Sequence, residues 1–133
     1  MTLTIHADDV YHVFYDGDMV LSRMFSDDTA SVSLSDVCVL TVKGENFEGG
    51  HGILASTSIG VVTDDTWKCS GGLEETGWHL PGFDDAAWSQ AQVIAANDGS
   101  FWMGVVPEIN PAAQWIWSQN SGDGVVFCRK RLC

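Results

Sequence analysis

Adjacent aspartates are the residues whose type and spacing most directly suggest chemistry in this chain. Four such pairs occur, at Asp8-Asp9, Asp27-Asp28, Asp64-Asp65 and Asp84-Asp85. Carboxylate oxygens are ligands that Ca²⁺ prefers, so two of them at one turn can begin a coordination shell. Aspartate side chains also bond their own backbone and close turns without any metal. For each pair both interpretations, calcium site and turn former, remain open.

Tryptophan is the second residue type that points to ligand binding, because six occur among 133 residues. A sugar ring lays an apolar face on an aromatic plane while nearby Asp, Asn and His side chains bond its hydroxyls. Trp78 and Trp102 stand beside loop-forming segments, and His79 follows Trp78. We predict that these three contact a ligand, with core packing of both tryptophans as the alternative. The remaining tryptophans lie in or beside strand-like segments and are predicted core residues: Trp67, Trp88, Trp115 and Trp117.

Catalytic motifs are absent from the sequence. There is no nucleophile elbow, zinc-protease helix, phosphate-binding loop or dinucleotide fingerprint. Two facing carboxylates could hydrolyse a glycoside, but the general acid must be a buried carboxyl with a raised pKa, and turn aspartates give no evidence of one. A site of two histidines plus a carboxylate is conceivable around Asp8-Asp9, although structural roles are favoured for the scattered His6, His12, His51 and His79. We predict that the protein is not an enzyme.

The charge balance excludes one class of partner. Eighteen acids against six bases give a net charge of −12. A nucleic-acid-binding face needs clustered Lys and Arg, and the basic cluster of this sequence is the short run 129–131 near its end. Hydrophobic residues make up 45% of the chain, which permits a core. No apolar run approaches the length of a membrane span, so we expect no membrane insertion.

Four cysteines without CxxC spacing argue against zinc and favour one or two disulfides, with buried thiols as the alternative. Their pairing stays open, and Cys133, at the extreme end, could instead cross-link chains into an oligomer. Disulfides persist in oxidising compartments, so we expect an extracellular or secreted setting. The first five residues lack the basic head and apolar stretch of a signal peptide. The expectation is therefore a protein made without one, or a mature or excised domain.

Apolar alternation and turn residues predict strands along most of the chain and no helix of three turns. The segment 37–42 is apolar on both faces and is expected to be a central strand. Turns are predicted at 16–18, 43–46 and 120–124, and loops at 23–29 and 47–52. The expected strands are 2–6, 10–15, 19–21, a half-exposed stretch at 32–34, 37–42, 53–62, 90–95, 114–117 and 125–132.

Residues 68–87 show no sustained periodicity. A structureless loop of this length inside a compact domain must be functional or pinned. We predict that Trp67, Cys69, Trp78 and Trp88 pin it. The whole pattern predicts an all-β protein, with residues 1–133 forming a single β-sandwich domain.

Several short motifs, in a fixed order, resemble a known family. They are ADDVYHVFYDG (7–17), a glycine-rich segment from Asn46 to Ala55, TDDTWKCS (63–70), GWHLPGFDDAAWSQA (77–91) and AAQWIWS (112–118). Together they are similar to the galactose-binding-like jelly-roll modules. Such modules accompany glycoside hydrolases such as α-L-rhamnosidases and β-galactosidases, and also occur as stand-alone lectin-like domains. The resemblance covers nearly the whole chain.

The resemblance implies a jelly-roll β-sandwich that binds carbohydrate, often with Ca²⁺, and does no chemistry itself. It adds Asn46 to the predicted ligand-binding residues. The opening acids also resemble the paired aspartates of PA14-type adhesin domains, which implies Asp8 and Asp9 as Ca²⁺ ligands. The four cysteines and the high acidity depart from the general pattern, and both suggest a self-standing extracellular protein.

Three functions follow as hypotheses, because fold similarity alone does not fix function. The first is a non-catalytic, lectin-like carbohydrate-binding domain, assisted by Ca²⁺, whose partner is a glycan. The second is a structural or adhesive domain of an extracellular matrix, with an acidic Ca²⁺-binding surface. The third is an accessory module of an enzyme.

Overall fold

The structure is a computed structural model, and it describes residues 1–24, 29–47, 51–101 and 104–133. In this part of the chain every regular element is a strand, so the all-β prediction is confirmed. No helix of the described residues has the length and hydrophobicity that crossing a bilayer requires. The strands are β1 (Thr2–Asp8), β2 (Val10–Tyr15), β3 (Asp18–Met24), β4 (Ala30–Ser33), β5 (Val39–Glu45), β6 (Gly52–Thr57), β7 (Lys68–Gly71), β8 (Ser89–Gln90), β9 (Gln92–Ala96), β10 (Gln114–Trp117) and β11 (Val125–Arg131).

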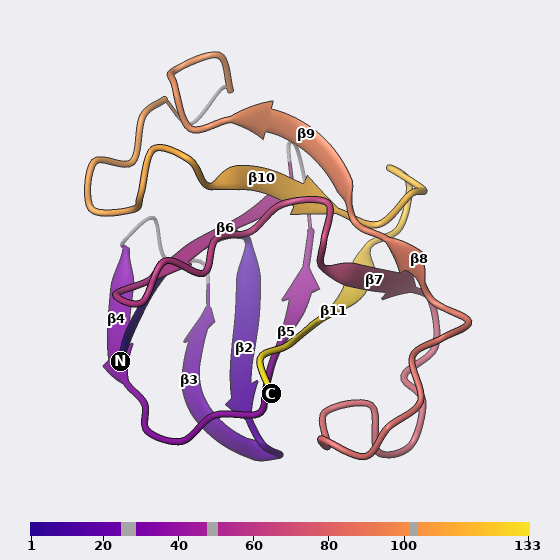
Figure 1. Cartoon of the computed structure of the whole chain (residues 1–133). Coiled ribbons are helices and arrows are strands. Elements are labelled where there is room, and N and C mark those ends of the chain that lie inside the picture. The colour runs from indigo at the N-terminus through magenta and orange to yellow at the C-terminus, as the bar shows by residue number, and fades with distance from the viewer. Residues whose placement is uncertain (25–28, 48–50, 102–103) are drawn as a thin grey trace.

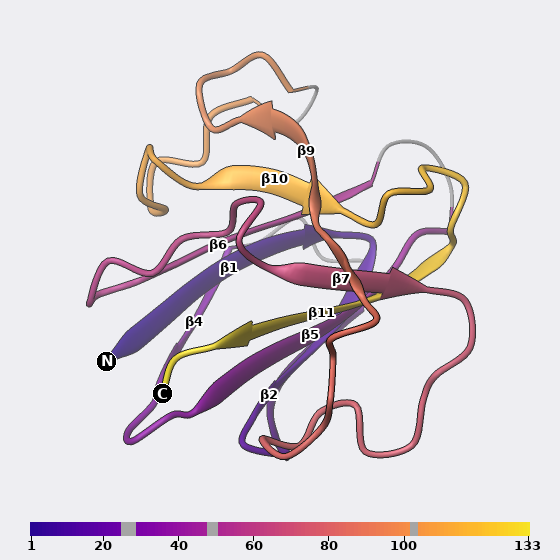
Figure 2. The same cartoon turned by 45° about the vertical axis from the view of Figure 1, so that its right-hand side comes forward.

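Two antiparallel sheets pack against each other as a β-sandwich (Figures 1 and 2). One sheet has five strands in the order β4-β1-β6-β10-β9, and the other has six in the order β3-β2-β5-β11-β7-β8. The predicted sandwich is therefore confirmed, and β5 is central as expected, between β2 and β11. Assignment to the jelly-roll type, and to a single domain, stays a prediction.

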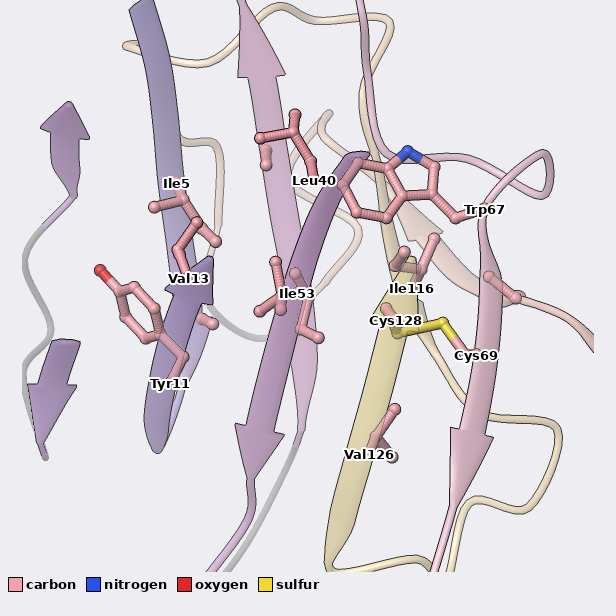
Figure 3. Close-up of a cluster of buried hydrophobic side chains, with 14 of the residues drawn as sticks. Ile5, Tyr11, Val13, Leu40, Ile53, Trp67, Cys69, Ile116, Val126 and Cys128 are labelled. Carbon is pink, nitrogen blue, oxygen red and sulfur yellow. A yellow bond between two sulfur atoms is a disulfide. The ribbon is translucent and has the colours of Figure 1, made fainter. Parts of the chain in front are cut away.

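The core lies between the sheets and follows from the alternation of side chains along each strand. Ile5 of β1, Val13 of β2 and Ile53 of β6 lie in one cluster (Figure 3), to which Leu3 and other apolar side chains also belong. Trp67 is also fully buried in it. Burial of this kind stabilises the fold by about 25 cal/mol for each Å² of apolar surface removed from water.

Two disulfides join residues far apart in the chain. Cys69 of β7 and Cys128 of β11 face each other in register and bond within the core (Figure 3). Cys38, just before β5, bonds Cys133. The disulfide prediction is confirmed. The expectation that Cys133 cross-links separate chains is wrong, because its sulfur is bonded within the chain.

Strand boundaries differ from expectation in several places. The predicted strand 53–62 turns back on itself after Thr57, since Gly60 has a φ of 92° and Val62 pairs with Ser56. The predicted turn at 43–46 is wrong, because β5 continues to Glu45. The predicted strand 90–95 is split at Ala91, so that β8 lies in one sheet and β9 in the other. The predicted loop at 23–29 is wrong at its start, because β3 continues to Met24, and β7 forms at residues 68–71, where no strand was predicted. Parts of the loops predicted at 23–29 and 47–52 fall outside the described residues.

Candidate functional site

The long segment between β7 and β8 is held against the outer face of the six-stranded sheet by one arginine. The side chain of Arg129, on β11, is 0% exposed, and its Nε donates to Asp85 Oδ2 at 2.9 Å. Its guanidinium also donates to the carbonyl oxygens of Trp78, Leu80 and Phe83. One buried side chain therefore binds four points of the segment. Sequence reasoning missed this pin, because Arg129 belongs to a charged run that reads as solvent-exposed.

An aromatic cluster completes the attachment of this segment. Trp78 is 2% exposed and makes edge contacts with Phe14 (ring centroids 5.4 Å apart) and Phe127 (5.0 Å). Of the two alternatives left open for Trp78, core packing describes it, and its predicted role in pinning the long segment is confirmed. The predicted packing of Trp88 is confirmed: it is 8% exposed, its ring meets Phe83, and its Nε1 donates to a glutamate.

A surface groove of about 210 Å³ lies beside the same segment, and we call it the polar groove. It runs between β7, the end of the long segment at β8, and the turn from β10 to β11. Its lining is mostly short hydroxyl, amide and carboxylate side chains next to one indole. The lining residues that matter below are Ser70, Gly71, Trp88, Ser89, Ser118, Gln119, Asn120 and Asp123.

The geometry of the polar groove depends on a missing side chain. A Cβ atom on Gly71 would lie 1.8 Å from Asp123 Oδ2, so only glycine allows the carboxylate to lie against β7. Asp123 Oδ2 is 2.7 Å from the Ser118 hydroxyl, and the Asp123 carbonyl accepts a hydrogen bond from Trp117 Nε1 at 3.1 Å. The carboxylate is thus placed by Ser118 and by its close approach to Gly71, and the Trp117 hydrogen bond fixes the backbone of the same residue. The predicted turn at 120–124 is confirmed, but nothing in the sequence showed that Gly71 lies beside it.

Unused polar atoms remain in the polar groove. The side-chain oxygen of Asn120 accepts from the amide of Gly122 at 3.0 Å, while its NH₂ group has no hydrogen-bond partner among the described residues. Of the two carboxylate oxygens of Asp123, Oδ2 is the one that meets Ser118. A donor and an acceptor therefore line the same groove, and the hydroxyl groups of a ligand can use both.

The predicted site residues divide between two ends of β2. Asp9 precedes β2: its amide donates to Glu45 O at 2.8 Å, and its Oδ2 accepts from the amide of Phe47, so Asp8-Asp9 lies beside Asn46. His79 instead packs on Phe14, which is five residues beyond Asp9 and therefore roughly 16 Å from it along the strand. The structure does not bring Asn46 together with Trp78 and His79. Trp102 lies outside the described residues.

The aspartates that the structure describes act mainly in turns. Asp64 Oδ1 accepts from the amide two residues ahead at 2.9 Å, and Asp84 Oδ1 does the same at 3.0 Å. Asp16 accepts from two successive amides before and at the start of β5. Among the described residues no group of three or more His, Cys, Asp or Glu is placed to hold a metal. Ca²⁺ binding at Asp8-Asp9 therefore stays a prediction, and Asp27-Asp28 lies outside the described chain.

The histidines have separate surroundings. His6 lies 3.2 Å from the hydroxyl of Thr29, and His12 lies 2.8 Å from that of Ser22. The ring of His51 packs on Trp117, and burial lowers its pKa below the ordinary value. The Nδ1 atom of His79 is buried without a hydrogen-bond partner in the described chain. The favoured structural interpretation fits the contacts of His6, His12 and His51, whereas ligand contact by His79 stays a prediction.

Comparison with known proteins found an α-L-rhamnosidase of Streptomyces avermitilis that is 30% identical to this chain over 132 residues. The match covers 85% of this chain but only 13% of the enzyme. No protein-family model and no solved structure matches the chain. The similarity is thus to one small region of a much larger protein.

Proposed function

We propose that this protein is a non-catalytic carbohydrate-binding domain and that the polar groove is its binding site. The observation that carries the proposal is the groove itself, in which the Asn120 amide, the Asp123 carboxylate and serine hydroxyls lie together beside Trp88. Sugars are recognised by a few fixed polar groups next to an apolar surface. The volume of about 210 Å³ is below the roughly 300–1,000 Å³ of pockets for drug-sized ligands, which suits a terminal sugar unit.

The number of carboxyl groups in the polar groove supports binding of a glycan rather than its hydrolysis. Glycoside hydrolysis commonly uses two carboxyl groups, roughly 5–9.5 Å apart, on either side of the scissile bond. Among the described residues that line the groove, Asp123 alone carries a carboxyl group. A single carboxylate, already hydrogen-bonded to Ser118, serves as an acceptor for a sugar hydroxyl.

The partial similarity to a rhamnosidase supports a role as an enzyme-associated module. A domain that corresponds to a small part of a glycoside hydrolase can hold a glycan near catalytic machinery that lies elsewhere. Glycans that end in L-rhamnose are therefore the first ligands to test. The two disulfides are compatible with an extracellular setting, which we include in the proposal.

Ca²⁺ assistance is a separate part of the proposal. Asp8 and Asp9 form a corner beside Asn46, and carboxylate and amide oxygens suit this cation. Thermal unfolding with millimolar Ca²⁺, and with Mg²⁺ as the ion control, tests it. A cation that binds only the folded protein at a hundredfold excess over its Kd stabilises it by about 2.7 kcal/mol. We expect the Ca²⁺ shift to vanish in Asp9→Asn and to persist in Asp18→Asn, an exposed control; no shift in the unmodified protein would contradict the calcium site.

The structural or adhesive alternative has less support than carbohydrate binding. Covalent cross-linking of separate chains required a free Cys133, and that sulfur is bonded to Cys38 of the same chain. The net charge of −12 still allows a basic partner.

A matched pair of variants tests the polar groove. Asn120 and Asn110 both accept a hydrogen bond from the amide two residues ahead, at 3.0 and 2.8 Å, but only Asn120 lines the groove. Neutral glycans on an array should bind the unmodified protein. Asn120→Ala should weaken the best ligand by about tenfold, the value of one hydrogen bond, whereas Asn110→Ala should leave it unchanged. Background signal for every glycan, or equal losses in both variants, would contradict the proposal.

A further inference from the structure

A second cavity, of about 300 Å³, lies at the other end of β7, and we call it the basic cavity. Its lining residues are Thr66, Lys68, Asp85, Arg129, Lys130 and Arg131. These include four of the six basic residues of a chain whose net charge is −12. The two others, Arg23 and Lys43, lie on β3 and β5. Positive charge is therefore concentrated at one place on an otherwise acidic molecule.

The pairing of β7 with β11 gathers these cations. Lys68 is directly opposite Arg129 in the register of the two strands, so both side chains leave the same face of the sheet. Arg131, two residues further along β11, shares that face. Lys130 leaves the opposite face, and its Nζ reaches the hydroxyl of Thr66 at 2.8 Å. Lys68 of β7 thus adds a fourth cation to the run 129–131, and Thr66, just before β7, also lines the cavity.

The fold neutralises only part of this charge. Like charges directly opposite each other on neighbouring strands are unfavourable. Asp85 is the one carboxylate in the lining, with Oδ2 2.9 Å from Arg129 Nε and Oδ1 3.7 Å from Lys68 Nζ. In the described part of the chain no carboxylate lies within ion-pair distance of Lys130 or Arg131. Two cations of the cavity are therefore left without a counter-charge.

Hydrogen-bond donors also remain at these two side chains. Within the described chain Lys130 Nζ makes one hydrogen bond, to Thr66, out of three that an ammonium group can donate. Arg131 donates once, from one terminal nitrogen to the carbonyl of Pro81 at 2.8 Å. A guanidinium has five N–H groups in a planar fork that matches carboxylate and sulfate oxygens. The basic cavity thus offers both charge and directed donors.

We propose that the basic cavity binds the acidic group of a glycan, either the carboxylate of a uronic acid or a sulfate ester. The inference rests on the proposed carbohydrate-binding function and names the class of glycan as anionic. Arg131 binds two oxygens of the acidic group, and Lys130 supplies a second positive charge. Arg129 is a positioning residue: its donors are occupied by Asp85 and by backbone carbonyls, and it holds the cavity wall in place.

The probes are trigalacturonic acid, its neutral methyl ester, a sulfated disaccharide and inorganic sulfate, titrated calorimetrically into the full chain. We compare the unmodified protein with Lys130→Gln/Arg131→Gln. The control is Arg23→Gln/Lys43→Gln, which removes the same charge outside the cavity, and thermal unfolding verifies that both variants fold. We expect one acidic glycan to bind, its affinity to fall at least tenfold in the cavity variant, and the control to retain it. Binding should weaken as salt is raised, because part of the attraction is screened.

Several outcomes would overturn the inference. These are equal affinity for the acid and its ester, equal losses in both double variants, or binding of inorganic sulfate without either acidic glycan. The probe that binds, galacturonate or sulfated sugar, identifies the source of the charge. If neutral glycans bind and need Asn120, but no acidic glycan binds, this inference is wrong and the proposed function stands. If acidic glycans bind and need Lys130 and Arg131, but no neutral glycan binds, the polar groove is not the binding site.

Discussion

The two cavities at the ends of β7 are built from opposite kinds of side chain. The polar groove uses short neutral groups and one carboxylate, fixed by turn geometry and by the absence of a side chain at Gly71. The basic cavity uses long cations around the ion pair of buried Arg129 with partly exposed Asp85. Short fixed groups recognise the arrangement of hydroxyls, whereas the cations recognise a charged group, to which the planar fork of Arg131 adds directed donors. The four-residue strand β7 therefore lies between two sites, one that would bind the hydroxyl groups of a glycan and one that would bind its acidic group.

The largest predicted effect concerns the anchor that the two cavities share. Arg129→Met should destabilise the protein by about 2–4 kcal/mol, because it removes the partly exposed ion pair with Asp85 and leaves the carbonyl oxygens of Leu80 and Phe83 without their buried donor. Both cavities should lose their ligands, since the long segment borders each of them. Urea unfolding measures the stability. Arg131→Met, an exposed neighbour on the same face, should cost less than about 1 kcal/mol, and equal costs in the two variants would contradict the anchor role.

A smaller effect should separate the two cavities. Gly71→Ala places a methyl group where Asp123 lies, so the carboxylate must move away from β7 and from Ser118. We expect a loss of about 1–3 kcal/mol in stability, typical of overpacking, and loss of neutral-glycan binding with anionic-glycan binding retained. Gly82→Ala is the control, because a Cβ there meets nothing within 4 Å. Anionic binding that disappears together with neutral binding would show that the cavities are not independent.

The smallest effect is a pH dependence that should leave both cavities unchanged. Burial against Trp117 lowers the pKa of His51 from 6.5, so the unfolded chain binds a proton more readily than the folded protein. Stability should therefore decrease as the pH falls through about 6.5, and His51→Gln should flatten this slope in thermal melts between pH 8 and 5. No histidine is among the described residues that line either cavity, so glycan affinities should stay constant over the same range.

The strands could be predicted from the sequence because buried and exposed residues follow a regular pattern along each of them. Alternation in β2 and β11, and two-sided hydrophobicity in β5, gave the sandwich and its central strand. The even number of cysteines predicted disulfides, but pairing depends on register between β7 and β11, which local sequence does not contain. Local sequence also did not show that β8 and β9 belong to different sheets.

The candidate sites were less predictable, because each depends on contacts between distant segments. Trp78 looked exposed in a glycine-rich loop, but the loop folds back onto β11 and covers it through Arg129. The polar groove requires Gly71 beside Asp123, and the basic cavity requires Lys68 beside Arg129. Turn residues and the basic run were visible in the sequence. Their partners, some fifty to sixty residues away, became apparent only in the folded chain.

Mapping a neutral ligand onto the protein by NMR tests the central claim most directly. A rhamnose-terminated disaccharide is titrated into the ¹⁵N-labelled chain, and the backbone amide shifts are followed residue by residue. The account predicts that the changes cluster at 70–71, 88–89 and 118–123, around the polar groove. Changes confined to the corner of Asp9 and Asn46, or to the segment around Trp78 and His79, would contradict the assignment of the groove and place the binding site where the sequence alone had suggested it.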